Sequence, residues 1–434
     1  MIRIFTLLAL LMPYVLISQS SKVKKASKLA EDVESKVIEW RHDFHQNPEL
    51  SNREFETAKK IETHLKELGL KVQTKVAHTG VVGILETGKP GPVVGLRADI
   101  DALPVTERVE LPYASKVKSE YNNVETGVMH ACGHDTHIAI MMGVAEVLTK
   151  MKSDLKGTYK FIFQPAEEGA PRGEEGGAEL MVKEGVLKNP DVDVIFGLHI
   201  SAQTTIGQIN YRPEGIMAAA DQFYITVKGK QTHGSRPWGG VDPVVASAQI
   251  INSLQTIVSR QTDLTKEAAV ISVGMIQGGV RNNIIPEEVK MIGTIRTLDV
   301  QMQDLIHEKM KHMVPLVAES FGAEAEIDIN KGVPVTYNDP ELTEWAVPVL
   351  KNTIGSSNLN EIKAITGAED FAFFANEIPG FYYFIGGCPK DVNPAEAAPH
   401  HTPDFYVDDA GMKTGLMSMI NLAIEYSETK SQIH

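Results

Sequence analysis

The stretch TYKFIFQPAEEG, residues 158–169, is a short β-rich run that leads directly into two adjacent carboxylates, Glu167 and Glu168. A helix-like stretch at residues 137–150 precedes it, and similar β-rich runs occur at residues 80–86, 93–100 and 194–200. Strands that alternate with helices indicate an α/β sheet with covered faces. Acids at the end of a buried strand are typical of a functional site in such a sheet.

The pattern changes from about residue 221 onward. It there predicts a strand, a helix, two strands, a helix and a strand, at residues 223–227, 242–259, 269–276, 288–296, 299–318 and 324–329. This βαββαβ order is that of a ferredoxin-like unit. After Pro334 the chain returns to helix and strand. We therefore predict an α/β catalytic domain made of residues 21–216 and 331–434, with a smaller α+β domain, residues 217–330, inserted in it.

Length and composition exclude several classes of protein. The 434 residues suit two or three domains, and 42 Lys and Arg against 56 Asp and Glu leave a net charge of −14. An acidic chain lacks the clustered cations that phosphate backbones need, which disfavours nucleic-acid binding. Two cysteines, Cys132 and Cys388, are too few for a disulfide scaffold.

The first 20 residues have the pattern of a secretory signal. Arg3 precedes an apolar run from residue 4 to residue 17, and the small or polar Ser18, Gln19 and Ser20 follow it. The run is short for a membrane span, which needs about 20 apolar residues. We expect residues 1–20 to be removed, which leaves a periplasmic or secreted protein with no membrane span; an uncleaved anchor is the alternative.

The motif HACGHDTH, residues 130–137, offers ligands for a metal ion. Its glycine lets the backbone fold so that Cys132 and His134 can converge on one ion. A thiolate and an imidazole suit zinc, manganese, nickel or cobalt better than calcium or magnesium. The alternative is a buried thiol beside polar groups that cap the following helix.

Other strand and loop ends add further donors. One of the adjacent glutamates can bind a metal while the other takes a proton from water. His199 ends the apolar run 194–198, although a single histidine there could be a core residue, and His400 and His401 lie in a loop before Pro403. Asp99 and Asp101 close another strand, where capping is the alternative role. Together these residues are the donor set of a two-metal hydrolase.

The segments RADIDALP, HACGHD, FQPAEEG, GLH and H-x-P, in this order, resemble the amidohydrolase branch of the aminoacylase and carboxypeptidase metallopeptidases. The resemblance covers essentially the whole chain from about Arg41. It implies a zinc-exopeptidase-like α/β domain with an inserted ferredoxin-like dimerisation domain. It also implies two divalent ions, Mn²⁺ or Zn²⁺ first and Ni²⁺ or Co²⁺ as alternatives, bound by Cys132, His134, Glu168, His199 and His401.

Further roles follow from the same resemblance. Glu167 corresponds to the general base, which takes a proton from water and passes it to the leaving nitrogen. Asp99 and Asp135 resemble the acids that support metal-binding histidines. The segment 367–371, GAEDF, also matches the family and lies near its site, without a clear role.

The inserted domain carries matches of its own. His233 resembles a histidine that reaches a neighbouring active site and holds the substrate carbonyl oxygen, which implies a homodimer. Asn283 resembles a substrate contact, and Arg296 is a candidate for the substrate carboxylate because a guanidinium binds it in a bidentate way. The segment after His233, GSRPW at residues 234–238, departs from the family pattern and affects the expected substrate preference.

These observations predict a metal-dependent amidohydrolase that releases an amino acid from an N-acyl amino acid. An exported carboxypeptidase or dipeptidase on the same scaffold is the alternative, since its substrates also carry an amide next to a free carboxylate. A binding protein without activity would have lost the base or a ligand, and all six residues are present. A redox role for Cys132 lacks a Cys-x-x-Cys partner.

Overall fold

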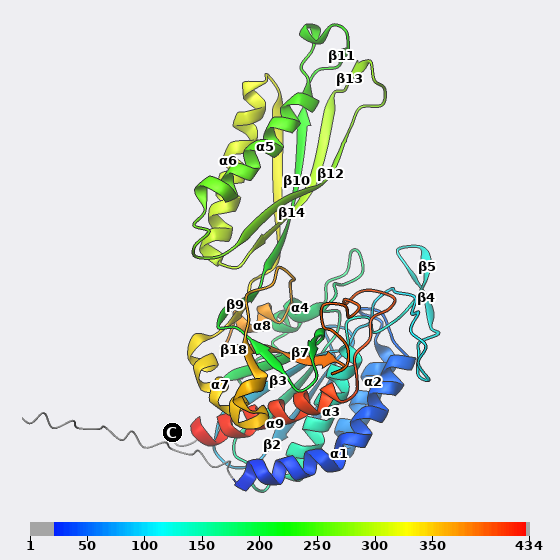
Figure 1. Ribbon diagram of the computed structural model, residues 1–434, viewed down its shortest axis with the longest axis vertical. Coiled ribbons are helices and arrows are strands. Elements are labelled where there is room, and N and C mark those ends of the chain that lie inside the picture. Colours follow the sequence, from blue (N-terminus) through cyan, green and yellow to red (C-terminus); the bar gives the residue numbers. More distant parts are fainter. Residues whose placement is uncertain (1–20, 431–434) are drawn as a thin grey trace, which may run out of the picture.

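The computed structural model describes residues 21–430, which form a large α/β domain and a smaller elongated domain joined to it at one end (Figure 1). The predicted signal segment, residues 1–20, lies outside the described residues. Within residues 21–430, no helix combines the length and the apolar character needed to cross a membrane.

The large domain is built on a mixed eight-stranded sheet with the order β1-β2-β6-β3-β7-β18-β8-β17. Strands β6, β3, β7 and β18 run parallel and form its centre, which is buried on both faces. Antiparallel strands flank this centre on both sides. The bounds are β1 Lys71–Val76, β2 Gly80–Glu86, β3 Val93–Asp99, β6 Thr158–Gln164, β7 Val194–Thr205, β8 Ile209–Tyr211, β17 Leu359–Glu361 and β18 Gly380–Cys388.

Helices cover both faces of this sheet. On one face lie α1 Ser21–Gln46, α2 Phe55–Glu67, α3 His134–Lys150, α7 Pro340–Ile354 and α9 Gly411–Lys430, which share a single apolar core with the strands. On the other face lie α4 Gly177–Lys183 and α8 Ala372–Ala375, over a smaller core. Helix α3 is buried from His134 to Leu148, which explains its almost continuous apolar sequence.

The small domain is a four-stranded antiparallel sheet, order β12-β14-β10-β15, with two helices packed on one face. Alternate residues of its strands point into the apolar core of the small domain, between the sheet and the helices. Its elements are β10 Ala219–Lys228, α5 Pro243–Gln261, β12 Ala269–Gly278, β14 Glu288–Thr297, α6 Val300–Ser320 and β15 Glu324–Val333. The predicted fold, an α/β domain with an inserted ferredoxin-like unit, is confirmed.

The two domains are connected through a short β-ladder. Strand β9, Glu214–Met217, leads into the small domain, and β16, Thr336–Asn338, leads out of it. The two strands pair antiparallel, with Met217 opposite Thr336. At the far end of the small domain, β11 Thr232–His233 pairs with β13 Ile284–Ile285 (Figure 1).

Several elements differ from the predicted ones. Strand β1 and the exposed hairpin β4 Lys118–Tyr121 and β5 Val124–Gly127 were not predicted, because their polar sequences give no apolar run. Helix α1 starts at Ser21, in a stretch whose lysines and serines dilute the apolar pattern. Small buried residues, Ala26 and Ala30, continue its buried face in that stretch.

Candidate metal centre

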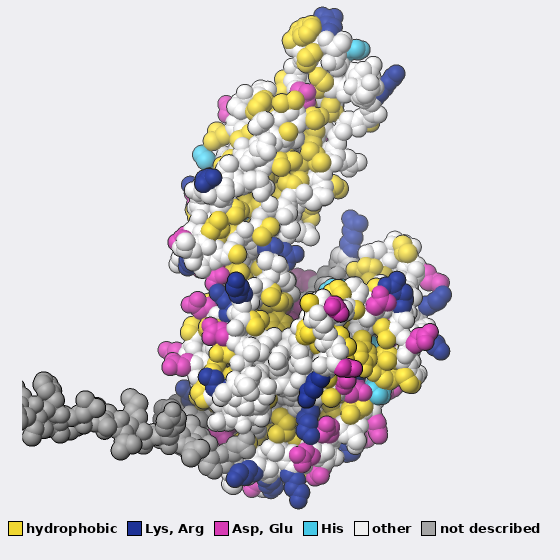
Figure 2. Space-filling model, viewed as in Figure 1, with side chains coloured by type: hydrophobic (Ala, Val, Ile, Leu, Met, Phe, Trp, Pro, Cys, Tyr) yellow, Lys and Arg dark blue, Asp and Glu magenta, His cyan; other side chains and the backbone are white. Residues whose placement is uncertain are grey.

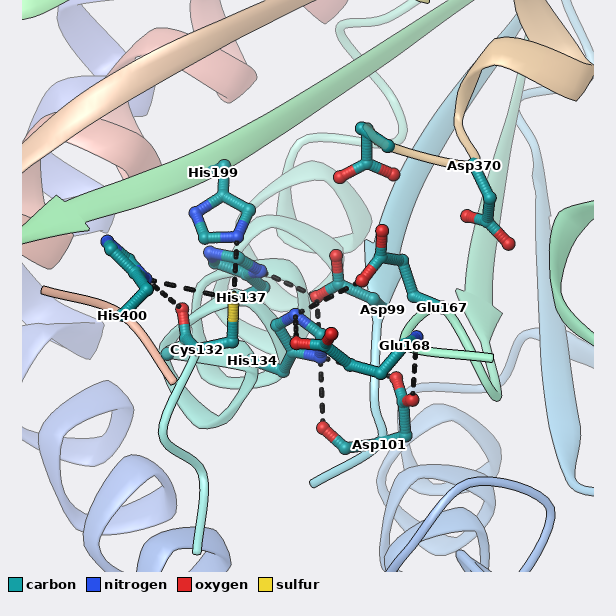
Figure 3. Close-up of polar contacts among 12 residues, drawn as sticks. Asp99, Asp101, Cys132, His134, His137, Glu167, Glu168, His199, Asp370 and His400 are labelled. Carbon is teal, nitrogen blue, oxygen red and sulfur yellow. Dashed lines mark hydrogen bonds and ion pairs between the residues drawn. The ribbon is translucent and has the colours of Figure 1, made fainter. Parts of the chain in front are cut away.

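The loop before α3 brings a thiol and an imidazole to the edge of the sheet. Gly133 lies between them with φ +92°, and a Cβ at this position would come within 2.5 Å of Ile200 Cγ2. Only glycine accepts this left-handed conformation in so little space. Cys132 and His134 are consequently buried beside each other at the helix N-terminus (Figure 3).

His134 is oriented by the loop that follows β3. Its Nδ1 lies 2.9 Å from the carbonyl oxygen of Asp101, which can only accept, so Nδ1 carries a proton. The other ring nitrogen, Nε2, is buried and has no hydrogen-bond partner among the described residues. It lies 3.8 Å from Glu167 Oε2 and 4.0 Å from Glu168 Oε1 (Figure 3). An unpaired nitrogen that faces two carboxylates fits a bound cation.

His199, on β7, contributes a second imidazole. Its Nδ1 donates to the carbonyl oxygen of Ile200 over 2.5 Å, which leaves Nε2 free and 3.3 Å from Cys132 Sγ. The thiol therefore lies between His199 on one side and a loop histidine on the other.

The loop histidines His400 and His401 have different environments. His400 Nε2 accepts from the backbone N–H of Ala202 over 3.1 Å, and its Nδ1 lies 3.2 Å from the carbonyl of Cys132, so both ring nitrogens are used by the backbone. His401 Nε2 lies 3.3 Å from Cys132 Sγ and 3.0 Å from Glu168 Oε1. Of the two, His401 has the nitrogen that is free to bind a metal.

The structure thus brings the five predicted ligands around Cys132 and Glu168. Their ligand atoms fall into sets within which all atoms lie within 4.8 Å of one another. Two of these sets share Cys132: one adds His199 and His400, and the other adds Glu168 and His401. A third set consists of His134, Glu167 and Glu168. Thiolate, imidazole and carboxylate together are borderline-soft ligands that suit zinc or manganese. The donor set and the unpaired His134 nitrogen fit a two-metal centre.

The electrostatics of the centre also favour a bound cation. Burial, with Glu168 and Glu167 nearby, raises the pKa of the Cys132 thiol well above its usual value. Burial lowers the pKa of His134, but Asp99, Asp101 and Glu168 outweigh it and raise this pKa to about 10. Divalent ions would replace these protons, since both ligands bind metals in their deprotonated forms.

Glu167 faces the centre from a cluster of acids. Its carboxylate shares a set with Glu369 and Asp370, and burial, with those two acids and Glu168, raises its pKa well above the ordinary value. A raised pKa suits a group that must accept a proton near neutral pH. The loop that carries Glu167 also holds Ala166 at φ +52°, an uncommon conformation for a residue other than glycine.

Arg97 holds the acid cluster together from the middle of β3. Its fully buried guanidinium bonds Asp99 Oδ2 at 2.8 Å, Glu369 Oε1 at 2.8 Å and Asp370 Oδ1 at 3.0 Å. The Tyr382 hydroxyl donates to the other oxygen of Glu369. These partners place the GAEDF segment directly beside Glu167, which agrees with the position that the family resemblance implies.

The two predicted supporting acids differ in their partners, and Asp99 Oδ1 lies 3.7 Å from Nδ1 of the predicted ligand His134. Asp99 accepts from His137 Nδ1 at 2.6 Å, and His137 Nε2 accepts from the backbone N–H of Ile200 at 2.8 Å. His137 thus links Asp99 to β7, at the residue that follows His199. Asp135 accepts from Arg41 Nε and His45 Nδ1, both on α1, and its support of a metal-binding histidine stays a prediction.

Asp101 also contacts the predicted ligand His134. Its carbonyl fixes His134, and its Oδ2 accepts from the backbone N–H of Glu168 at 3.1 Å and from Ser51 Oγ at 2.7 Å. Sequence reasoning noticed Asp101 only as a charged strand end. The signal was its place two residues after Asp99, on the same side of the strand end.

The predicted substrate-binding residues lie on the small domain, away from these ligands. His233 is exposed at the far tip, and Asn283 lies beside it because β11 pairs with β13 (Figure 1). The backbone N–H of Ser235 donates to His233 Nδ1 over 3.1 Å, so a neutral His233 carries its proton on Nε2 as a donor. Arg296 is half-buried on β14 and contacts none of the metal-centre residues in hydrogen bonds of the described chain.

The loops at the strand ends of this α/β sheet bring together a thiol, imidazoles and carboxylates, which is typical of a metal-dependent hydrolase. The chain belongs to peptidase family M20/M25/M40, whose sequence pattern matches residues 95–425. The family predicted from the motifs is therefore confirmed, including its amidohydrolase branch.

Three relatives illustrate the similarity. Thermostable carboxypeptidase 2 of Saccharolobus solfataricus is 39% identical over 407 residues, 93% of this chain and 99% of that protein. N-acetylcysteine deacetylase of Bacillus subtilis is 36% identical over 396 residues, 91% of this chain and 98% of that protein. The solved structure of the Bacillus subtilis YXEP protein, described as a dinuclear metal-binding peptidase, matches with TM-score 0.77 and 33% identity, covering 92% and 99% of the two chains.

Proposed function

We propose that this enzyme hydrolyses the amide bond of N-acyl amino acids and releases the amino acid and a carboxylic acid. The observation that carries the proposal is the position of Glu167, which shares a set of close carboxylate and imidazole groups with Glu168 and His134. Relatives named as a deacetylase and as a carboxypeptidase both support hydrolysis of an amide beside a carboxylate. The carboxypeptidase or dipeptidase activity is the alternative.

We assign separate roles to the metal ligands, to Glu167 and to Arg97. Cys132, His134, Glu168, His199 and His401 would hold two divalent ions, for which we propose Mn²⁺ or Zn²⁺. Such ions lower the pKa of water and polarise the amide carbonyl. Glu167 takes the proton of the attacking water and delivers it to the leaving nitrogen, and the Arg97 cluster keeps the neighbouring acids from moving into its place.

The experiment is amine release from a panel of N-acyl amino acids and dipeptides, with added Mn²⁺ or Zn²⁺ and with a chelator. Chelator-sensitive release from acyl amino acids is the expected result. Release from dipeptides alone would replace the proposal by the dipeptidase, and release from neither would refute both.

We also propose that the enzyme is a homodimer in which the small domain of one copy serves its partner. Strand β12 is an edge strand with Val270, Met275 and Ile276 exposed, and Figure 2 shows hydrophobic side chains along this domain. Unpaired edges of this kind accept a second chain. Light scattering is expected to give twice the chain mass, and specific activity is expected to fall when the enzyme is diluted below the dissociation constant.

Export from the cytoplasm is proposed on the pattern of residues 1–20 alone. Fractionation of cells that produce the full chain, followed by N-terminal sequencing, tests it.

A further inference from the structure

A cavity of about 490 Å³ opens beside the metal centre, where the large domain meets the connection to the small one. Cys132, Glu167, Glu168, His199 and His401 line one side of it. Its volume lies within the range of about 300–1,000 Å³ that small-molecule sites have. Part of a substrate whose amide bond reaches the centre would have to lie here.

The cavity also has an apolar wall. It consists of Met217, Ile362, Ile365 and Phe384. Met217 and Phe384 are each 8% exposed, whereas Ile365 is 39% exposed and extends into the open cavity. The wall is fixed, because the N–H of Ile365 donates to the carbonyl of Ile216 at 3.0 Å and its carbonyl accepts from Ala218.

Four uncharged polar side chains line the cavity; Ser201, Thr204 and Asn210 are linked by hydrogen bonds, and Gln203 is exposed. Thr204 Oγ1 accepts from Asn210 Nδ2 at 2.9 Å, and Ser201 Oγ lies 3.1 Å from the same hydroxyl. Asn210 Oδ1 accepts from Asn360 at 3.1 Å. These groups offer little to a charged substrate group.

The carboxylates that line the cavity already have partners or roles in the chain. Glu168 and Glu167 have the roles given above, and both oxygens of Glu369 are bonded, one by Arg97 and the Phe371 N–H and the other by Tyr382. Among the described residues that line the cavity there is neither lysine nor arginine. A charged group that enters the cavity away from the metal ligands would lose water without gaining a counter-ion from a lysine or arginine, which is costly.

We propose that this cavity binds an uncharged, mainly apolar substituent of the scissile amide and discriminates against a charged one. The inference rests on the proposed function and names its substrate class. The substituent can come from either half of the substrate, the acyl group or the amino-acid side chain, since both flank the amide. The substrate carboxylate then lies outside the apolar wall.

Two substrate series tell the halves apart in the metal-loaded enzyme. One varies the acyl group on glycine (acetyl, benzoyl, succinyl), and the other varies the amino acid under an acetyl group (methionine, aspartate, lysine). In one series, kcat/KM for the apolar member is expected to exceed that of each charged member by about tenfold or more. A difference below about threefold in both series would overturn the proposal.

Ile365→Lys adds a cation to the wall and is expected to shift the same series at least about tenfold towards its acidic member. Ile365→Asp is the mirrored change and should disfavour the acidic member further. Val124→Lys is the matched control, because Val124 is 63% exposed on the remote β4–β5 hairpin. An unchanged ratio in both Ile365 variants, with normal metal content and melting temperature, would also overturn the proposal.

The proposed function can fail separately. If only dipeptides are hydrolysed, the amidohydrolase is refuted, and the same apolar-to-charged ratio is then measured among dipeptides. Equal rates there would refute the cavity's preference as well, and a preference for apolar residues would support it. If neither acyl amino acids nor dipeptides are hydrolysed, both proposals are refuted.

Discussion

The metal centre and the tip of the small domain contrast in how their functional side chains are held. At the centre, His134, His199 and Asp99 are buried and fixed by hydrogen bonds from strands far apart in the sequence. At the tip, His233 is exposed, and within the described residues the hydrogen bonds of its ring are to Ser235, two residues away. The centre is preorganised by bonds between distant parts of the chain, whereas the ring at the tip is held only by its own loop.

The largest effect is expected from Cys132→Ala. Removal of the thiol that both ligand sets share should abolish metal binding and activity and lower the melting temperature, because bound metal contributes to folding free energy. Elemental analysis and thermal unfolding measure both. Cys388→Ala is the matched control, since Cys388 is the other buried free thiol and lies outside the site. Normal metal content in Cys132→Ala would remove this residue from the centre.

Glu167→Gln should keep the metals and lose activity by about 10²–10⁴-fold, because only the base is removed. The measurement is kcat with elemental analysis on the same sample. Glu179→Gln, on the exposed surface of α4, serves as control. Residual activity above a few per cent would assign the base to another residue.

The buried pair of His45 and Asp135 should make the large domain sensitive to alkaline pH. Burial lowers the pKa of His45, but Asp135 outweighs it and raises the pKa from 6.5 to about 9. The stabilisation is complete below pH 6.5 and is lost as the pH rises through 9, about 3 kcal/mol in total. Urea unfolding at pH 6 and pH 9 should show this loss in the wild type but not in His45→Gln. Equal losses would contradict the assignment.

The smallest effect on stability is expected at the tip. His233→Ala should change the free energy of unfolding by no more than about 0.5 kcal/mol. Its activity should nevertheless fall about tenfold or more, because a donor to the carbonyl oxygen is lost. His312→Ala, an exposed histidine on α6 of the same domain, is the control. Full activity in His233→Ala would show that the tip does not take part.

The same contrast explains what could be predicted from sequence. Cys132, His134, Glu167 and Glu168 are neighbours in two short motifs, so local spacing was sufficient to group them. Partners that meet only through the sheet could not be paired in advance. Arg97 and Glu369 are 272 residues apart, and Asp135 meets Arg41 from 94 residues away.

The inserted domain shows the same difference between local patterns, which can be predicted, and long-range arrangement, which cannot. Its order of strands and helices was readable from apolar periodicity, since each element buries one face in a local core. Its distance from the centre was not readable, because it depends on the path of two connecting strands.

Those connecting strands have a consequence for redesign of the protein. Since Met217 lies opposite Thr336, β9 and β16 form a hairpin of the large domain in which the whole small domain takes the place of the turn. A turn of about two residues would close the same hairpin. Replacement of the small domain by such a turn would therefore leave the eight-stranded sheet of the large domain unbroken.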